Sequence, residues 1–242
     1  MNLCVDQGNS RTKVAVFEQN VLQKTFVFEQ FTDTEFSSLL EQFPIKRCII
    51  SSVRNICIES FDFVTTKVEK MIFLNHNTPI PVQNRYETPE TLGKDRLAAI
   101  VGANYLKPND NILVIDAGTA ITYDYINDKS QYLGGNIAPG LNMRCKALHS
   151  FTQKLPLVNP NDEIDNAILG RNTFSAIQKG VSQGLIYEIE GYISELNAKN
   201  ANFSVFLTGG DANYFFNRLK SPTFVEIFLV LIGLNRILEH NA

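Results

Sequence analysis

Two stretches of the chain share one succession of apolar and polar positions. In LCVDQGNSRTKVAV, residues 3–16, an apolar run ends on an acid, and glycine, hydroxyl-bearing residues and a second apolar run follow. LVIDAGTAITYDYI, residues 113–126, repeats this order at a constant offset of 110 positions, so that Asp6 matches Asp116 and Gly8 matches Gly118. Val, Ile, Tyr and Thr on both sides of a glycine-containing turn are typical of β-hairpins. Each stretch is therefore predicted to form a strand, a tight turn and a second strand.

The apolar pattern elsewhere predicts strands and helices in both halves of the chain. Mixed strands and helices of this kind indicate an α/β fold. The predicted elements are a short apolar strand at 47–53, a helix at 94–106, a long amphipathic helix at 175–199, a strand entering a turn at 203–212, and a buried strand running into a helix at 224–234.

The repeat suggests two lobes of similar fold, each opening with a hairpin. The stretch LKPNDN, residues 106–111, contains proline and turn-forming residues and is predicted to connect them, which gives lobes at 1–108 and 109–242. A single D-x-G turn is also a common plain hairpin turn. Two copies at equivalent places indicate instead that a cleft between the lobes uses both turns at once.

Composition excludes several classes of protein. The 242 residues are 44% hydrophobic and 19% charged with a net charge of −3, so the basic surplus of a general nucleic-acid binder is missing. The first residues lack the features of a signal peptide, and the most apolar stretch is shorter than the roughly 20 residues that span a bilayer. We expect a cytoplasmic location. Reduced thiols are expected rather than disulfides or a zinc site, because ligand spacing is absent from Cys4, Cys48, Cys57, Cys145 and the three histidines.

The first turn, DQGNSRTK, has the chemistry of a metal–nucleotide site. Gly8 lets the backbone N–H groups approach a ligand closely, and Lys13 brings a mobile positive charge. Asp6 alone would repel a polyphosphate, but with Mg²⁺ between them it becomes a ligand, directly or through water. The stretch is not a Walker A loop, whose spacing does not occur in the chain.

The second turn and a later glycine pair extend this chemistry. Asp116 could hold a cation, and Thr119 could bond a phosphate. In TGGD the adjacent Gly209 and Gly210 follow a strand and would let a base or a ribose lie against the backbone, with Asp211 at a helix N-cap position.

The stretch YETPETLGKDRLAAI, residues 86–100, predicts a loop shaped by Pro89 and Gly93 and then a helix that begins near Asp95 and Arg96. In the functional interpretation Asp95 is a general base and Arg96 grips a substrate carboxylate with its planar fork. In the alternative, Asp95 caps the helix and Arg96 points to solvent.

Five motifs together resemble those of type III pantothenate kinases. They are D-x-G-N-x-x-x-K at 6–13, G-x-D-R at 93–96, D-x-G-T-A-x-T at 116–122, G-G-x-I-x-P-G at 134–140 and T-G-G at 208–210. The resemblance implies two ribonuclease H-like lobes of the actin-like ATPase fold around a central nucleotide cleft. It also implies transfer of the ATP γ-phosphoryl group to pantothenate, which gives 4'-phosphopantothenate in the first step of coenzyme A biosynthesis.

The resemblance also implies the role of each site residue. Asp95 would accept the hydroxyl proton, Asp6 would hold Mg²⁺ through water, and Asp116 would bind a monovalent cation, K⁺ or NH₄⁺. Thr173 would touch pantothenate from the neighbouring subunit of a homodimer. ATP would be bound by Asp6, Gln7, Gly8, Asn9, Ser10, Arg11, Thr12, Lys13, Thr119, Gly209 and Gly210. The pantothenate site would be lined by Tyr86, Gly93, Lys94, Asp95 and Arg96.

Three further points remain open at this stage. The position that matches Lys13 in the second hairpin is Tyr123, so the monovalent cation could replace a missing lysine charge. A kinase of another small alcohol or acid would use the same lobes. A non-catalytic homologue that assists transcription is a third interpretation, against which the retained charged residues argue.

Overall fold

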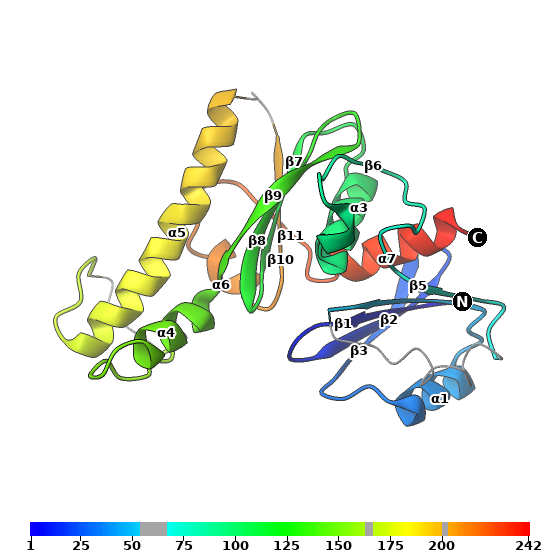
Figure 1. The fold of residues 1–242 in the computed structure, drawn as a ribbon, viewed down its shortest axis with the longest axis horizontal. Helices are drawn as coiled ribbons and strands as arrows, with labels where there is room; N and C mark the ends of the chain where they lie inside the picture. The colour runs from blue at the N-terminus through cyan, green and yellow to red at the C-terminus, as the bar shows by residue number, and fades with distance from the viewer. Residues whose placement is uncertain (54–66, 163–166, 200–202) are drawn as a thin grey trace. The chain divides into compact units, whose positions relative to one another are not determined.

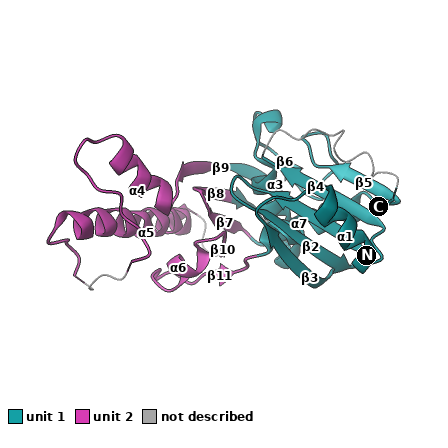
Figure 2. Cartoon of the chain, turned by 90° about the horizontal axis from the view of Figure 1, so that it is seen from below, with its two compact units in different colours: residues 1–110, 125–134, 228–242 teal, residues 111–124, 135–227 magenta. Residues whose placement is uncertain are grey.

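The computed structural model describes residues 1–53, 67–162, 167–199 and 203–242. The chain forms two compact units (Figure 2). The first holds Met1–Asp110, Tyr125–Gly134 and Phe228–Ala242, and the second holds Asn111–Asp124 and Gly135–Ile227. The division into ribonuclease H-like lobes at 1–108 and 109–242 stays a prediction.

The first sheet has five strands in the order β3-β2-β1-β4-β5 (Figure 1). The strands β1, β2 and β3 pair antiparallel, and β4 and β5 extend the sheet in parallel with β1. Their bounds are β1 Asn2–Gln7, β2 Thr12–Glu18, β3 Val21–Phe28, β4 Arg47–Ser52 and β5 Lys70–Phe73.

The second sheet repeats this order and adds one strand. Its order is β11-β10-β7-β8-β9-β6, so that β9-β8-β7-β10-β11 corresponds to β3-β2-β1-β4-β5, with β7, β10 and β11 again parallel. The match confirms the duplication that the hairpin repeat predicts, and it confirms the α/β class. The bounds are β6 Gln83–Asn84, β7 Ile112–Ala117, β8 Ala120–Ile126, β9 Gln131–Pro139, β10 Ser204–Thr208 and β11 Phe224–Val225.

Both predicted hairpins are present, but their turns are built differently. In the first, the residues from Gly8 to Arg11 lie between the strands, and Gly8 N donates to Arg11 O at 3.0 Å. In the second, only Gly118 and Thr119 lie between the strands, and Gly118 N donates to Ala120 O at 3.0 Å. The constant sequence offset therefore does not give turns of equal length.

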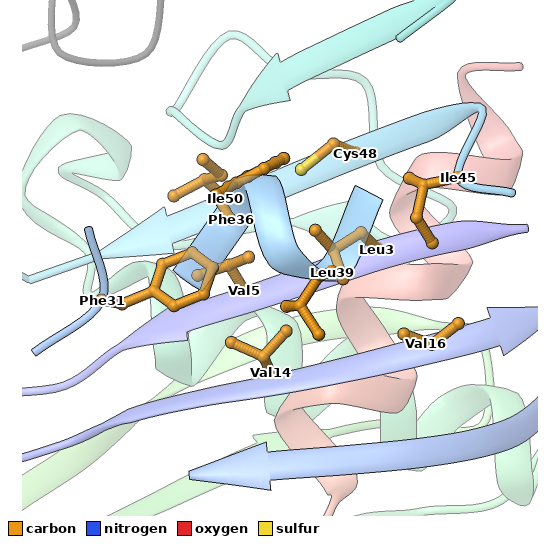
Figure 3. Packing of buried hydrophobic residues seen from close by; sticks show 10 residues of the cluster. All are labelled: Leu3, Val5, Val14, Val16, Phe31, Phe36, Leu39, Ile45, Cys48 and Ile50. Carbon is orange, nitrogen blue, oxygen red and sulfur yellow. The ribbon is translucent and has the colours of Figure 1, made fainter. Parts of the chain in front are cut away.

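One face of the first sheet packs on helix α1, Asp33–Gln42, which begins at Thr32 with a capping box closed by Glu35. The buried side chains Phe36 and Leu39 of α1 lie against apolar side chains of β1, β2 and β4 (Figure 3). Because strand side chains alternate between faces, Leu3 and Val5 enter this core while Cys4 faces the other side.

The helices predicted from the sequence are present, with bounds that agree within a few residues. The helix α3, Lys94–Leu106, has the predicted bounds, and α5, Thr173–Lys199, begins two residues before its prediction. The segment 224–234 forms the short β11 and then enters α7, Leu229–His240. The other helices are η2 Pro89–Thr91, α4 Leu141–Ser150 and α6 Ala212–Phe216.

Cys4, Cys48 and Cys145 are free thiols in buried positions, whereas Cys57 lies outside the described residues. Burial raises the pKa of Cys4 and of Cys48, which keeps both thiols protonated.

Among the helices in the described ranges, we find none with the length and apolar character to span a bilayer.

Polar side chains tie α7 to the first sheet. Asn2 on β1 donates to Asn235 at 2.8 Å and to Glu239 at 2.5 Å, and Arg47 on β4 donates to Glu239 at 2.8 Å. These buried and half-buried groups satisfy one another, so the C-terminal helix packs on the sheet without leaving this polar cluster unpaired.

The helices α3 and α7 touch backbone to backbone at two glycines. A Cβ on Gly233 would overlap the carbonyl oxygen of Ala98 and lie 2.9 Å from Gly102 N. A Cβ on Gly102 would overlap the carbonyl oxygen of Leu229. The contact has no room for a side chain, and it holds α3, whose first turn carries Asp95 and Arg96.

We predict that Gly233→Ala lowers the free energy of unfolding by about 2–3 kcal/mol, because the added methyl group forces the helix backbones apart. Gly191→Ala is the matched control, since a methyl group on Gly191 in α5 would meet no other described part of the chain within 4 Å. The control should be neutral or stabilising by up to about 1 kcal/mol. Urea denaturation measures both, and equal effects would contradict the proposed close contact.

Candidate functional site

The first acid-tipped turn begins where burial of β1 ends. Leu3, Cys4 and Val5 are fully buried, and Asp6 is the first partly exposed position. In the sheet register Asp6 is the partner of Lys13 on β2 and of Ser51 on β4. Directly paired residues share a face, so Lys13 and Ser51 flank Asp6 on the same face of the sheet.

Ser51 is a site-adjacent residue that sequence reasoning missed. Its hydroxyl is buried and has no hydrogen-bond partner among the described residues. It lies inside the apolar strand β4, where the sequence carries no signal for a polar contact. Its place beside Asp6 follows only from the pairing of β1 with β4.

The turn residues themselves divide into three groups by their exposure. Asn9, Ser10 and Arg11 are exposed, while Gln7, Gly8 and Lys13 are partly exposed. Thr12 is buried instead, and its hydroxyl has no partner in the part of the chain that the structure covers. The equivalent Thr122 of the second hairpin has an equally enclosed hydroxyl.

The first turn of α3 brings the residues of the G-x-D-R motif together. The N-cap is Gly93, with no side-chain cap, and Asp95 Oδ1 accepts a hydrogen bond from Arg96 N at 2.9 Å. A Cβ on Gly93 would lie 2.6 Å from Asp95 Oδ1, so this position has little space for another residue. Lys94 Nζ lies 3.3 Å from the carbonyl oxygen of Ser52, at the end of β4.

Arg96 does not point to solvent, so that part of the alternative interpretation is wrong. The residue is only 6% exposed, and its Nη2 donates to the hydroxyl of Tyr132 at 3.1 Å. Its Cζ also lies 5.6 Å from the ring centroid of Tyr86. Tyr86 and Arg96, predicted to share a site, are thus in contact, and Tyr132 is a partner that no motif indicated.

The second acid-tipped turn is enclosed by two glycines from other segments. Asp116 pairs with Thr208 on β10, and a Cβ on Gly209, which has φ of +93°, would overlap Asp116 Oδ1. Gly140 N donates to Thr119 O at 3.1 Å, and a Cβ on Gly140 would overlap the carbonyl oxygens of Gly118 and Thr119. The structure therefore brings together Asp116, Thr119 and Gly209.

Asp211 takes the N-cap position of α6, as predicted, but makes no side-chain cap hydrogen bond. Its backbone N donates to Ala117 O at 2.9 Å, which fixes the T-G-G-D turn beside the end of β7. Burial raises the pKa of its carboxyl group. Gly210 has open space where a Cβ would stand.

Tyr123 is not an exposed counterpart of Lys13. It is 2% exposed, and its hydroxyl donates to Glu188 on α5 at 2.8 Å. Glu188 also accepts from Arg144 at 2.6 Å, and Arg144 Nε donates to the carbonyl oxygen of Pro139 at 2.7 Å. Burial and the neighbouring Glu188 raise the pKa of Tyr123. This network braces the end of the G-G-x-I-x-P-G motif from α5.

Thr173 is the first residue of α5 and lines a cavity of about 870 Å³ in the second unit. The walls are mainly apolar and include Ala147, Leu148 and Val181. Several large apolar side chains of the same unit are strongly exposed, among them Phe151, Ile168, Leu169 and Phe174. Among the described residues, no group of three or more His, Cys, Asp or Glu could by itself hold a metal ion.

The duplicated sheet, with an acid at the end of each central strand, defines a class of protein. Solved structures with this fold include a ROK family glucokinase from Streptomyces griseus in complex with glucose and AMPPNP, at a TM-score of 0.53 and 11% identity over 99% of both chains. Another, from Campylobacter jejuni, is named for the Baf family of transcriptional activators and has a TM-score of 0.64 at 25% identity, over 99% of this chain and 98% of that one. The chain has the actin-like ATPase fold of the sugar kinases.

Sequence comparison narrows the class to one family. A family model described as type III pantothenate kinase matches residues 2–195. Type III pantothenate kinases of Phocaeicola vulgatus and Porphyromonas gingivalis are 46% and 44% identical, and each comparison covers 100% of this chain and 99% of the relative. The chain belongs to the type III pantothenate kinase family. It is a phosphotransferase that acts in coenzyme A biosynthesis.

We predict that Gly209→Ala lowers the free energy of unfolding by about 2–4 kcal/mol and weakens ATP binding, because a left-handed backbone is strained and the methyl group displaces Asp116. The adjacent Gly210→Ala is the control and should change stability by less than about 0.5 kcal/mol. Urea denaturation and ATP titration measure the two effects. Equal losses of stability in both variants would contradict the assignment of the enclosed position to Gly209.

Proposed function

We propose that the chain phosphorylates pantothenate with Asp95 as the proton acceptor and Arg96 as the group that grips the substrate carboxylate. The observation that carries this proposal is the buried Arg96 guanidinium, held by Tyr132 and in contact with Tyr86, one residue from Asp95. A charged side chain that is nearly buried is costly to desolvate, and buried charged groups are frequent at functional sites. Gly93 and Lys94 complete the substrate-binding segment.

Phosphoryl transfer needs in-line positioning and charge neutralisation more than covalent help. Arg96 holds the acid end of pantothenate and thereby directs its primary hydroxyl toward Asp95, which accepts the proton as the oxygen attacks phosphorus. One oxygen of Asp95 accepts from Arg96 N, which orients the carboxylate. Tyr86 forms an apolar wall beside the guanidinium.

The residues from Asp6 to Lys13 bind the phosphates of ATP in this proposal. Lys13 supplies positive charge, and the N–H groups of the exposed turn supply hydrogen bonds to phosphate oxygens. From the second unit, Thr119, Gly209 and Gly210 also contribute to ATP binding. The open space at Gly210 supports a close approach of a ligand to the backbone there.

The residues present fit the two kinds of cation that the family resemblance implies. Asp6 offers a carboxylate on the strand paired with that of Lys13, and among the described residues it belongs to no group of three or more His, Cys, Asp or Glu that could hold a metal. This suits Mg²⁺ bound mainly by water and phosphate. Asp116 offers a carboxylate in a cradle that a Cβ on Gly209 would fill, and K⁺ or NH₄⁺ is proposed to bind there. When bound, both ions supply positive charge against the charge of the transferring phosphoryl group.

A homodimer is part of the proposal. Phe151 is 89% exposed, Leu169 78% and Ile168 75%, and Phe174 follows Thr173 at the start of α5. Ile168, Leu169 and Phe174 also lie close together in the chain, and clustered exposed apolar side chains are typical of protein interfaces. A second copy that covers this surface would bring Thr173 to the pantothenate of its partner.

We place the enzyme in the cytoplasm, where its free buried thiols stay reduced.

The proposal is tested by a coupled assay with pantothenate and MgATP, run with and without K⁺. We expect turnover that depends on K⁺ and that falls by about 10²–10⁴-fold in Asp95→Asn, because the general base is lost. ATP titration of the same variant should show unchanged affinity. Full activity of Asp95→Asn would remove Asp95 from the mechanism, and K⁺-independent turnover would remove the monovalent cation.

We predict that Phe174→Asp shifts the protein from dimer to monomer, because a buried interfacial charge without a partner is unfavourable. Sedimentation velocity measures the change. Phe224→Asp is the control, since Phe224 is 51% exposed on the edge strand β11, outside the proposed interface, and should leave the dimer intact. A monomeric wild-type protein, or a dimeric Phe174→Asp variant, would contradict this interface.

A further inference from the structure

Tyr132 on β9 is buried beside the proposed substrate-binding arginine. It is fully enclosed, whereas its neighbour Leu133 is 51% exposed. Its hydroxyl accepts a hydrogen bond from Arg96 Nη2 at 3.1 Å. A guanidinium group has five N–H donors in a fixed plane, so a partner at one of them restricts the orientation of the whole group.

The ring of Tyr132 makes a second contact with the same segment. It stacks on the ring of Tyr86 with a centroid distance of 6.0 Å and an interplanar angle of 12°. Arg96 Cζ lies 5.6 Å from the Tyr86 centroid, so the three side chains form one group. Stacked aromatic rings are stiff neighbours, and they limit the space into which the guanidinium could rotate.

The backbone of Tyr132 holds Tyr86 independently of the side chain. Asn84 on β6 is the register partner of Tyr132, and Arg85 N donates to Tyr132 O at 2.9 Å. Tyr86 N donates to Asn84 Oδ1 at 3.0 Å. Removal of the Tyr132 hydroxyl therefore leaves the strand pairing and the ring stacking in place, and it breaks the hydrogen bond to Arg96.

From this geometry we infer that Tyr132 is a positioning residue for substrate recognition: its hydroxyl sets the plane of the Arg96 guanidinium that binds the carboxylate of pantothenate. The inference rests on the role proposed above for Arg96. Tyr132 does not touch the reacting atoms, and its effect reaches the substrate only through Arg96. A change at its hydroxyl should thus alter the binding of the acid end of the substrate and leave the phosphoryl-transfer step nearly unchanged.

The test is Tyr132→Phe, with kcat and KM measured for both substrates. We expect KM for pantothenate to rise by about tenfold or more, because one N–H of a buried guanidinium loses its partner. We expect kcat to change by less than about threefold and KM for ATP to stay the same, because the lost hydrogen bond affects only the binding of the substrate carboxylate by Arg96. Tyr105→Phe removes a hydroxyl from a more exposed tyrosine on α3, whose ring contacts Arg236, and should leave all constants unchanged.

A substrate analogue separates positioning from a general structural effect. Pantothenyl alcohol keeps the hydroxyl that accepts phosphate but lacks the carboxylate. The inhibition constant of pantothenyl alcohol, measured with pantothenate as the varied substrate, should be the same for the wild-type enzyme and for Tyr132→Phe. If Tyr132→Phe lowered the affinity for the analogue as much as the affinity for pantothenate, the inference would be overturned, because the Tyr132 hydroxyl would then act on the site as a whole.

A double-mutant cycle distinguishes failure of this inference from failure of the role of Arg96. In an Arg96→Lys background, Tyr132→Phe should have no further effect on KM for pantothenate. If Arg96→Lys alone leaves this KM unchanged, the proposed role of Arg96 is wrong. If Arg96→Lys raises KM but Tyr132→Phe in the wild-type background does not, only the role of Tyr132 is wrong.

Discussion

The structure depends on one constraint, the complete burial of the central strands β1 and β7 up to the residue before their acids. Four successive residues of β7 and of β1 are buried, and Asp6 and Asp116 are the first partly exposed positions. A carboxylate at one of the buried positions earlier in either strand would need a partner, because an isolated buried charge is very costly. The end of each strand is therefore the place where the sheet can present a charge to a ligand.

Close backbone packing then gives these acids their surroundings. Gly209 leaves space beside Asp116, Gly140 lies against the turn that follows it, and Gly93 leaves space beside Asp95. In each case the glycine is needed because a neighbouring oxygen occupies the position of a Cβ. The contact between α3 and α7 has the same basis at Gly102 and Gly233, and it holds the helix that begins with the substrate-binding residues.

Recognition of an acidic substrate is favoured by a cation whose orientation is fixed. Arg96 donates to the Tyr132 hydroxyl and contacts the Tyr86 ring, so less conformational freedom is lost when a carboxylate binds than for a mobile surface side chain. The backbone pairing of β6 with β9 brings the two tyrosines to one place. The Glu188–Arg144–Pro139 contacts brace the second unit in a comparable way, from α5 to the start of α4.

The sequence by itself determined the two hairpins, the helices α3 and α5, and the family, because local periodicity and short motifs carry this information. The tertiary structure alone decided which distant residues meet. Ser51 lies beside Asp6 through strand pairing, Tyr132 meets Arg96, and Tyr123, at the position that matches Lys13 in the repeat, donates to Glu188. These contacts depend on sheet register, turn length and helix packing, which join residues far apart in the chain and leave no periodic pattern in the sequence.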